Sequence, residues 1–254
     1  KPNPAFVAYK KSIVIIGLVV VWLIVPNYVH SMFVPPLASV LEAGRELAVT
    51  GKLWLHTIAS LKVAFVGLAI STVIAVPLGV LLGWFKTVED YIDPVFQIMR
   101  NTSILAILPL FLLIFGVGDI SKYAIVIWAC LPPTLINTIQ GVKNADPVLI
   151  RSARSMGIGT PGLFLKVVMP SAMPFILAGF RLSAGIALIV LVGAEMLGAR
   201  YGLGFMIYNF MHAYMIPDMY VGILMLAIIG IIVNAVLVRA ENYLTRWQEK
   251  NVNV

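Results

Sequence analysis

Ionisable side chains inside long apolar runs are the residues of this sequence whose types and spacing could do chemistry. Arg100 is followed by Asn101, Thr102 and Ser103, and this group of one guanidinium, one amide and two hydroxyls would suit the passage of an anion. Ionisable groups inside a membrane are costly, so their default interpretation is functional. The alternative is that Arg100 extends to the membrane surface while its polar neighbours pack helices together. The sequence leaves both open.

A second pair of ionisable residues, Arg181 and Glu195, lies fourteen positions apart in one apolar run. On a helix they would share a face but be separated by about 21 Å, so they cannot pair within the chain. Glu195 lies near the end of its run, where it could bond Arg200 or backbone groups. It could instead be a gate residue that pairs across a dimer. We therefore place the candidate translocation pathway and gate at six residues: Arg100, Asn101, Thr102, Ser103, Arg181 and Glu195.

Enzyme chemistry is not expected from the remaining residues. The three histidines, His30, His56 and His212, lack the spacing of metal ligands, and we expect structural roles for them. The sequence has no Walker-type glycine loop and no evident nucleophile–base arrangement. We expect a chain without catalytic residues that binds no metal or cofactor itself. Its single cysteine, Cys130, lies in an apolar run and is expected to be buried.

Composition places these residues in a membrane protein. Of the 254 residues, 61% are hydrophobic and 11% are charged, whereas ordinary soluble domains carry about 25% charged residues. A soluble protein this apolar would expose surfaces that aggregate. The net charge of +7 comes from basic residues at the ends of apolar runs rather than in one cluster. We therefore exclude nucleic acid as a partner and expect a lipid bilayer.

Six segments are long and apolar enough to cross a bilayer, which takes about 20 residues as a helix. They are residues 12–29, 53–85, 91–115, 123–142, 170–197 and 219–238. The apolar runs are continuous, unlike the alternating strands of a membrane barrel. The sequence thus predicts an all-α integral membrane protein with one transmembrane domain over residues 1–254.

The distribution of lysine and arginine predicts the orientation of the spans. With a cytoplasmic N-terminus, thirteen of these residues fall inside and five outside, as the positive-inside rule requires. Both termini would then be cytoplasmic. Outside, residues 35–50 are expected to form a helix at a watery surface. Residues 203–216 are expected to form an interfacial helix, an outer gate or a docking surface for a protein that delivers substrate.

The cytoplasmic loop over residues 145–169 contains signals for two helices. Asp146 and Pro147 are typical of a helix start, and Gly157 is typical of a helix end. Thr160-Pro161 repeats the start signal, and Pro170 is expected to end the second helix. The loop should therefore fold as helix, glycine turn and helix.

The surface of this loop suits a protein partner. Its small residues would allow close approach of a partner backbone, and its basic residues could pair with acidic groups. The small residues are Ser152, Ala153 and Ser155, and the basic ones are Arg151, Arg154 and Lys166. The simpler alternative is an ordinary positively charged cytoplasmic loop.

The order of residues in the loop resembles a known motif. Arg151-Ser152-Ala153 is followed by three residues, Gly157, nine residues and Val167-Val168-Met169-Pro170. This resembles the loop by which importer permeases of the ATP-binding-cassette (ABC) class grip their ATPase subunits, with the pattern Glu-Ala-Ala, three residues, Gly, nine residues, Ile-x-Leu-Pro. The family glutamate is replaced by arginine, so its contact is not carried over. The resemblance implies ATPase coupling through Arg151, Ser152, Ala153, Arg154, Met156, Gly157 and Pro161.

The chain from about residue 33 to residue 239 resembles the nitrate, sulfonate, taurine and bicarbonate branch of these permeases. The resemblance rests on residues 33–37 (Phe-Val-Pro-Pro-Leu), 181–185 (Arg-Leu-Ser-Ala-Gly), 194–198 (Ala-Glu-Met-Leu-Gly) and 202–205 (Gly-Leu-Gly-Phe). It implies a type I importer fold with a cytoplasmic coupling helix in a bacterial inner membrane. It also implies a homodimer, two ATPase subunits that bind ATP and Mg, and an extracytoplasmic binding protein.

Two further questions stay open at the level of sequence. Gly179 and Ser183 form a small-xxx-small pair, which would serve either dimerisation or packing within the chain. The cargo is expected to be a small anion such as nitrate, bicarbonate, a sulfonate or taurine. The alternatives are an uncharged cargo such as a vitamin precursor, or a self-sufficient secondary transporter or channel, which would normally show inverted repeats or interrupted helices.

Overall fold

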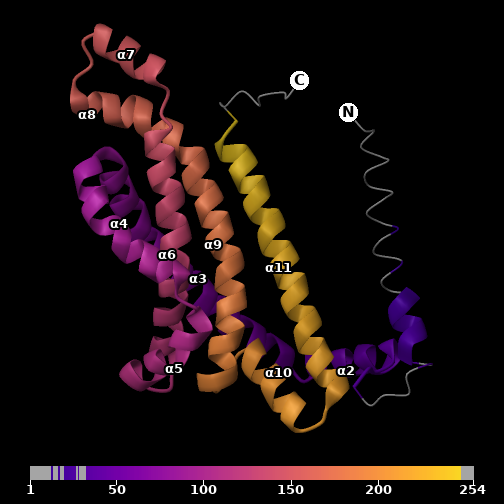
Figure 1. Cartoon of the computed structure of the whole chain (residues 1–254). Coiled ribbons are helices and arrows are strands. Elements are labelled where there is room, and N and C mark those ends of the chain that lie inside the picture. Colours follow the sequence, from indigo (N-terminus) through magenta and orange to yellow (C-terminus); the bar gives the residue numbers. More distant parts are fainter. Residues whose placement is uncertain (1–12, 14–16, 18–19, 27, 29–32, 247–254) are drawn as a thin grey trace.

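The computed structural model describes residues 13, 17, 20–26, 28 and 33–246, and no strand occurs among them (Figure 1). The all-α fold is therefore confirmed for the described part of the chain. The elements are α2 (Leu37–Val49), α3 (Lys52–Trp84), α4 (Lys86–Asn101), α5 (Ile104–Phe115), α6 (Asp119–Lys143), α7 (Pro147–Ser155), α8 (Thr160–Leu163), the π-helical turn η1 (Phe164–Val168), α9 (Met169–Gly198), α10 (Leu203–His212) and α11 (Ile216–Leu244).

Four helical stretches of the described residues are long and apolar enough to cross a membrane. They are Lys52–Trp84, Asp119–Lys143, Thr160–Gly198 and Ile216–Leu244, and a bent pair, Lys86–Asn101 and Ile104–Phe115, makes five if it counts as one span. The predicted first span, residues 12–29, lies only partly within the described residues, and those that are described, 13, 17, 20–26 and 28, are helical. A total of six spans stays a prediction.

The predicted continuous helix over residues 91–115 is wrong, because α4 and α5 meet at an angle of 99°. Thr102 and Ser103 are extended between them. The Thr102 hydroxyl donates to the Ile98 carbonyl at 2.7 Å, and the Ser103 carbonyl accepts the first backbone bonds of α5. Hydroxyl side chains offer the backbone such local partners outside a helix. The break therefore falls at the polar stretch that interrupts the apolar run.

Pro170 does not end the second helix of the 145–169 loop, contrary to expectation. The helix runs without interruption from Thr160 to Gly198. The π-helical turn η1 ends at Val168, two residues before the proline, and the Met169 N–H bonds the Phe164 carbonyl five residues back. A π turn adjusts the backbone next to a residue that lacks a donor. Residues 160–169 of the loop and the predicted fifth span thus form one helical stretch, which turns between α8 and α9 in Figure 1.

The centre of the bundle is the packing of α6 between α3 and α9. A Cβ atom at Gly179 of α9 would lie 2.7 Å from Cβ of Asn137, so only glycine permits this approach of α9 to α6. Ser183 Oγ lies 2.7 Å from Thr134 Oγ1 and donates to the Cys130 carbonyl at 3.0 Å. The pair Gly179 and Ser183 therefore serves packing within the chain. Cys130 is buried, as expected.

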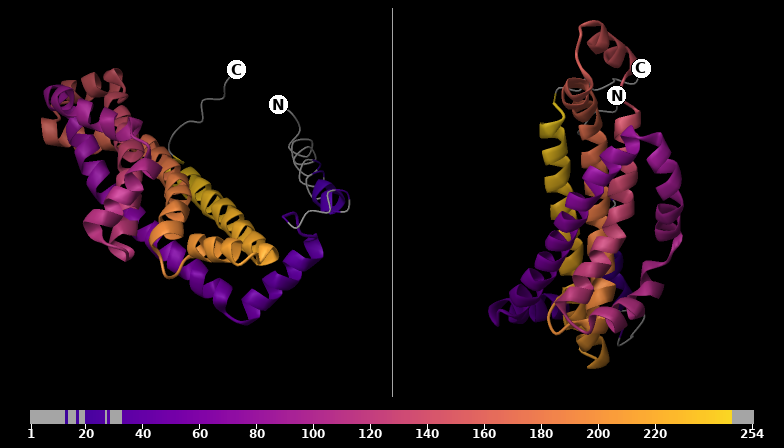
Figure 2. Two further views of the ribbon diagram at one scale, coloured as in Figure 1. Left: turned by 60° about the horizontal axis from the view of Figure 1, so that its bottom comes forward. Right: turned by 90° about the vertical axis from the view of Figure 1, so that its left-hand side faces the viewer.

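The helices that do not cross the bundle gather at its two ends. α7 and α8 project from one end, at the top of Figure 1, whereas α2, α5 and α10 lie at the opposite end. Figure 2 shows the same separation from two further directions. Apolar residues of α2, α10 and α11, among them Val40, Met206 and Val221, share one buried cluster. The two predicted outer helices, α2 and α10, therefore lie at one end of the bundle, away from the 145–169 loop.

Candidate functional site

The start of α7 is fixed by the residues that the sequence singled out. Asp146 precedes the helix, and its Oδ1 accepts a hydrogen bond from the Val148 N–H at 2.7 Å. Pro147 occupies the first helical position, where no backbone donor is needed. Further along the helix, Arg151 Nε donates to the Pro147 carbonyl at 3.2 Å. These bonds set the register of a nine-residue helix that stands apart from the bundle.

The end of α7 is a glycine-dependent turn. Gly157 has a φ of +77°, in the left-handed region. Its N–H bonds the Arg154 carbonyl at 2.9 Å, and the Ile158 N–H bonds the Ala153 carbonyl at 3.1 Å. This pair of bonds is the Schellman motif, which satisfies the last carbonyls of a helix. The left-handed conformation explains why glycine occupies position 157, and the turn there is the one that the sequence predicted.

Ala153, one of the small residues expected to allow a partner to approach, is instead buried within its own chain. Ala153 is 2% exposed, so the close approach that it allows is between α7 and the helix that follows it. The other residues of the predicted coupling set are exposed, namely Arg151, Ser152, Arg154, Met156, Gly157 and Pro161. A cavity of about 630 Å³ lies between α7 and the start of α9, and Ser152, Met156 and Lys166 contribute to its lining.

The exposed part of the 145–169 loop also carries apolar side chains, which a partner could cover. Val148, Leu149 and Leu165 are each more than half exposed, and Met156 is 72% exposed. The sequence did not indicate that Val148, Leu149 and Leu165 are exposed, because apolar residues of this kind are also found in the buried positions of helices. Exposed apolar groups with adjoining basic groups are typical of a protein-binding surface.

The polar group at residues 100–103 lies at the break between α4 and α5. Arg100, Asn101 and Ser103 are exposed, and Thr102 is half-buried. Within the described part of the chain, no hydrogen bond or ion pair joins this group to Arg181 or Glu195. The structure thus presents these residues on the surface of the single chain, where a second copy or a substrate could reach them.

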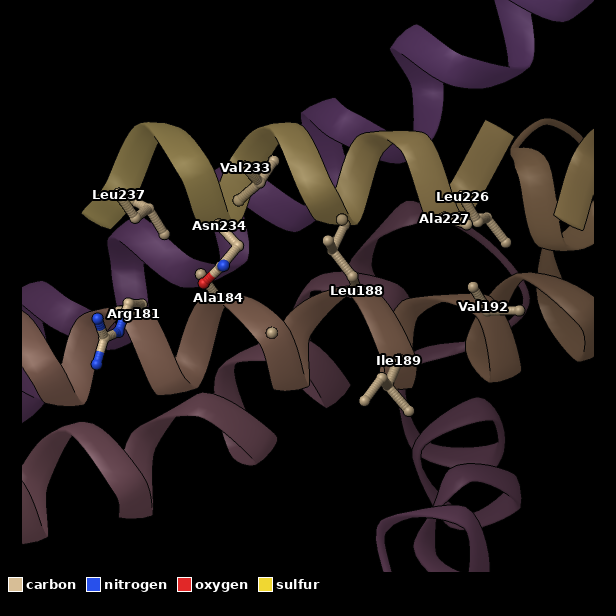
Figure 3. Close-up of a pocket in the computed structure, with 12 residues that line it drawn as sticks. Arg181, Ala184, Leu188, Ile189, Val192, Leu226, Ala227, Val233, Asn234 and Leu237 are labelled. Atoms are coloured by element: carbon tan, nitrogen blue, oxygen red, sulfur yellow. The ribbon is translucent and has the colours of Figure 1, made fainter. Parts of the chain in front are cut away.

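Arg181 has a partner that the sequence did not reveal. Its Nη1 lies 2.8 Å from Oε2 of Glu241 on α11. The two helices also border a cavity of about 330 Å³, with Arg181 and Asn234 among its lining residues. In Figure 3, Asn234 points from α11 toward α9. Glu241 lies sixty residues further along the chain, which explains why sequence spacing gave no signal of the pair.

The carboxylate of Glu195 is fully buried, with 0% of the residue exposed. Ser60 Oγ of α3 lies 2.7 Å and 2.8 Å from its two oxygens, and the Gly204 N–H donates to Oε2 at 2.8 Å. The same Ser60 hydroxyl accepts the Leu203 N–H at 2.8 Å. We name these four residues the Glu195 cluster. It joins α3, α9 and α10 and places a carboxylate at the N-terminus of α10, where negative charge is stabilised.

The glycines beside this cluster are required by its geometry. Gly202 has a φ of +136°, and a Cβ there would lie 2.2 Å from Glu195 Cδ. A Cβ at Gly204 would lie 2.5 Å from the Val192 carbonyl oxygen. The Gly202 N–H donates to His56 Nδ1 at 3.1 Å, which gives His56 a structural role. Residues 194–198 and 202–205, noted separately in the sequence, therefore form one unit in space.

Of the alternatives for Glu195, bonding to the backbone is the one that the structure contains. Among the described residues, Arg200 is not within ion-pair distance of Glu195. Pairing across a dimer would require the carboxylate to leave two donors inside its own chain, the Ser60 hydroxyl and the Gly204 N–H. A gate role for Glu195 stays a prediction, and it would involve rearrangement of the cluster.

Comparison with known proteins agrees with this architecture. Residues 75–250 match the family described as binding-protein-dependent transport system inner membrane component. The taurine transport system permease protein TauC of Escherichia coli (strain K12) is 32% identical over 237 residues, covering 91% of this chain and 85% of TauC. The putative aliphatic sulfonates transport permease protein SsuC of Bacillus subtilis (strain 168) is 29% identical, covering 98% and 91%.

Solved structures show the same fold. A chain of the MetNI methionine ABC transporter in an inward-facing conformation superposes with a TM-score of 0.64 at 22% identity, covering 74% of this chain and 93% of that one. A chain of an amino acid ABC transporter gives 0.63 at 17% identity, covering 80% and 97%. The chain thus belongs to the binding-protein-dependent transport system inner membrane component family, as an ABC importer permease subunit of the branch that includes the taurine and sulfonate permeases.

Proposed function

We propose that two copies of this chain form the translocation pathway of an importer for a small anion such as a sulfonate, taurine, nitrate or bicarbonate. An extracytoplasmic binding protein delivers the anion, and two separate ATPase subunits supply the energy. ATP and Mg bind to those subunits, and this chain has no catalytic residues of its own. The chain crosses a bacterial inner membrane several times, with both termini cytoplasmic.

The observation that carries the proposal is the construction of α7. The helix has a side-chain cap at Asp146, a glycine turn at Gly157 and an exposed face of apolar and basic side chains. An ordinary charged loop would need none of these features. A partner with a complementary apolar and acidic groove would bind this face, and in an ABC importer the ATPase is that partner.

Helical continuity gives the loop a mechanical role. α8, η1 and α9 form one helical stretch from Thr160 to Gly198, and the 30 residues of α9 alone extend for about 45 Å. The Glu195 cluster lies near its far end. A displacement of α7 by the ATPases would thus be passed through α8 and η1 to α9, which reaches the opposite end of the bundle, where α3, α9 and α10 are joined. We infer that alternating access uses movement of α9.

The preference for an anion rests on relatives and on charge. The relatives TauC and SsuC are named for taurine and aliphatic sulfonates, and Arg100 is an exposed cation at the break of a membrane-crossing element. A second candidate is an uncharged organic cargo. It is favoured by the formylaminopyrimidine transport permease protein ThiX of Halalkalibacterium halodurans, which is 27% identical and covers 97% of this chain and 98% of ThiX.

Co-purification followed by uptake tests the proposal. The tagged chain, expressed with its neighbouring subunits, should retain an ATPase in mild detergent, and the chain alone should hydrolyse no ATP. Vesicles that contain the full complex and the binding protein should then accumulate radiolabelled taurine or an alkanesulfonate on addition of ATP. Uptake of formylaminopyrimidine instead would favour the second candidate. Hydrolysis by the isolated chain, or transport without any ATPase, would contradict the proposal.

A further inference from the structure

A cavity of about 550 Å³ lies at the α10 end of the bundle, away from α7. Three cationic side chains, Lys62, Lys122 and Arg200, contribute to its lining, together with the carboxylate of Asp119. They come from α3, the start of α6 and the segment between α9 and α10. Three segments that are far apart in sequence thus place basic side chains around one cavity.

Lys122 is the most constrained of the three cations. It is 4% exposed, and its Nζ forms an ion pair with Asp119 Oδ1 at 2.6 Å. A buried ammonium costs free energy unless it is paired, and Asp119 meets that requirement. Glu195 also interacts electrostatically with Lys122, but its oxygens already accept bonds from Ser60 and Gly204. Lys122 is thus held in place beside the cavity.

Positive charge in the cavity exceeds what its own carboxylate balances. Among the described residues, neither Lys62 nor Arg200 has a carboxylate within ion-pair distance. Both are exposed in the single chain. Clefts lined by one sign of charge between low-dielectric walls concentrate ions of the opposite sign. The cavity should therefore have a positive potential.

The rest of the lining gives the cavity a mixed character. Leu55, Ile58 and Val117 add apolar surface, and Tyr123 and Tyr201 add aromatic rings with hydroxyl groups. A volume of this size is typical of small-molecule sites, which combine apolar walls with a few polar groups. The ligand that matches is an oxyanion with a short apolar tail.

We propose that this cavity binds an oxyanion group, such as a sulfonate or a phosphate, at the outer mouth of the permease. This inference rests on the proposed function and narrows its substrate chemistry to oxyanions. Lys62 and Arg200 pair with the anion, Lys122 stays paired with Asp119, and the apolar wall of α3 accepts the tail. The same chemistry is offered by an alkanesulfonate in solution and by a phospholipid headgroup.

Charge-selective labelling tests the potential of the cavity. Ile58, a lining residue that is 64% exposed, is replaced by cysteine in a Cys130→Ala background. The purified full-length chain is treated with negatively and positively charged methanethiosulfonate reagents. We expect the anionic reagent to react on the order of 10-fold faster, and Lys62→Gln with Arg200→Gln should abolish the preference. Met211→Cys on α10, outside the lining, is the control and should show no preference.

The two sources of oxyanion are distinguished by protection of the same cysteine. In maltoside detergent, millimolar 1-propanesulfonate should slow labelling of Ile58→Cys if the site takes a free anion. Protection in phospholipid nanodiscs alone, unaffected by propanesulfonate, would identify the headgroup as the ligand. Equal rates for the two reagents, or no protection from either source, would overturn the inference. Because no ATPase takes part, this result is independent of whether the coupling proposal holds.

Discussion

Glu195 Oε2 lies 2.8 Å from the backbone nitrogen of Gly204, so a carboxylate near the end of α9 accepts a hydrogen bond from the first turn of α10. Ser60 of α3 adds its hydroxyl to the same oxygens. The same α9 continues α8 and η1 without a break. Residues 160–169 of the 145–169 loop and residues 194–198 thus belong to one helical stretch, and α7 adjoins it through the turn at Gly157.

The first prediction concerns the acceptors of the Glu195 cluster. Glu195→Ala removes the acceptor for Ser60 and Gly204 and leaves buried donors unpaired, which should cost about 1–3 kcal/mol of stability. Glu195→Gln keeps one oxygen and should cost clearly less. Thermal unfolding of the purified chain in detergent, followed by tryptophan fluorescence, measures both. Equal midpoints for Glu195→Ala and the wild type would show that the cluster does not stabilise the fold.

The second prediction concerns the glycine beside this carboxylate. Gly202→Ala places a Cβ only 2.2 Å from Glu195 Cδ and puts alanine at a φ of +136°, which is strained for a residue with a side chain. Overpacking of this kind costs about 1–3 kcal/mol. The matched control is Gly185→Ala, because a Cβ there meets nothing within 4 Å. The unfolding midpoint should fall for Gly202→Ala alone, and a fall of similar size in both variants would contradict the geometry.

The third prediction concerns Gly157 and distinguishes loss of coupling to the ATPase subunits from loss of insertion into the membrane. Gly157→Pro cannot adopt the φ of +77° and loses the N–H bond to the Arg154 carbonyl. Substrate uptake by the complex should collapse, while the amount of chain in the membrane is unchanged. Gly159→Ala is the control, since its φ is −67° and a Cβ there meets nothing within 4 Å. Uptake that survives Gly157→Pro would remove the 145–169 loop from the mechanism.

The fourth prediction concerns the cation at the α4–α5 break. Arg100 is exposed, so Arg100→Ala should change stability by less than about 0.5 kcal/mol. Anion uptake in vesicles should nevertheless fall, and Arg100→Lys should restore part of it. If Arg100→Ala transports at the wild-type rate, the residue extends to the membrane surface and does not border the pathway.

Local chemistry made much of the fold predictable. The cap at Asp146, the turn at Gly157 and the helix over residues 35–50 depend on neighbours in sequence, and the structure confirms all three. The same local reasoning failed at Pro170, because a π turn upstream accommodates a proline whose usual effect is to end a helix. Whether a helix tolerates such a turn depends on its packing as well as its sequence.

The candidate site was less predictable, because its contacts are distant in sequence. Ser60 and Glu195 are 135 positions apart, and no spacing rule connects them. Gly202 and Gly204 were recognised in the sequence as part of a family pattern. The structure explains why they are glycines, because Glu195 leaves no room for a Cβ atom at either position. Lys62 and Lys122 were used only to predict orientation, and Arg200 was otherwise considered only as a possible partner of Glu195. Their common cavity becomes visible only when α3, α6 and α9 are placed together.

The fifth prediction concerns α7 as the contact through which separate ATPase subunits act on this chain. Met156→Cys, in a Cys130→Ala background, places a thiol on a residue of this surface that is 72% exposed. Met211→Cys on α10, at the opposite end of the bundle, is the matched control. The measurement is site-specific crosslinking in native membranes, with the captured protein identified by mass spectrometry. We expect Met156→Cys to capture an ATPase and Met211→Cys to capture none. Failure of Met156→Cys to capture an ATPase, or equal capture at both positions, would contradict this role of α7.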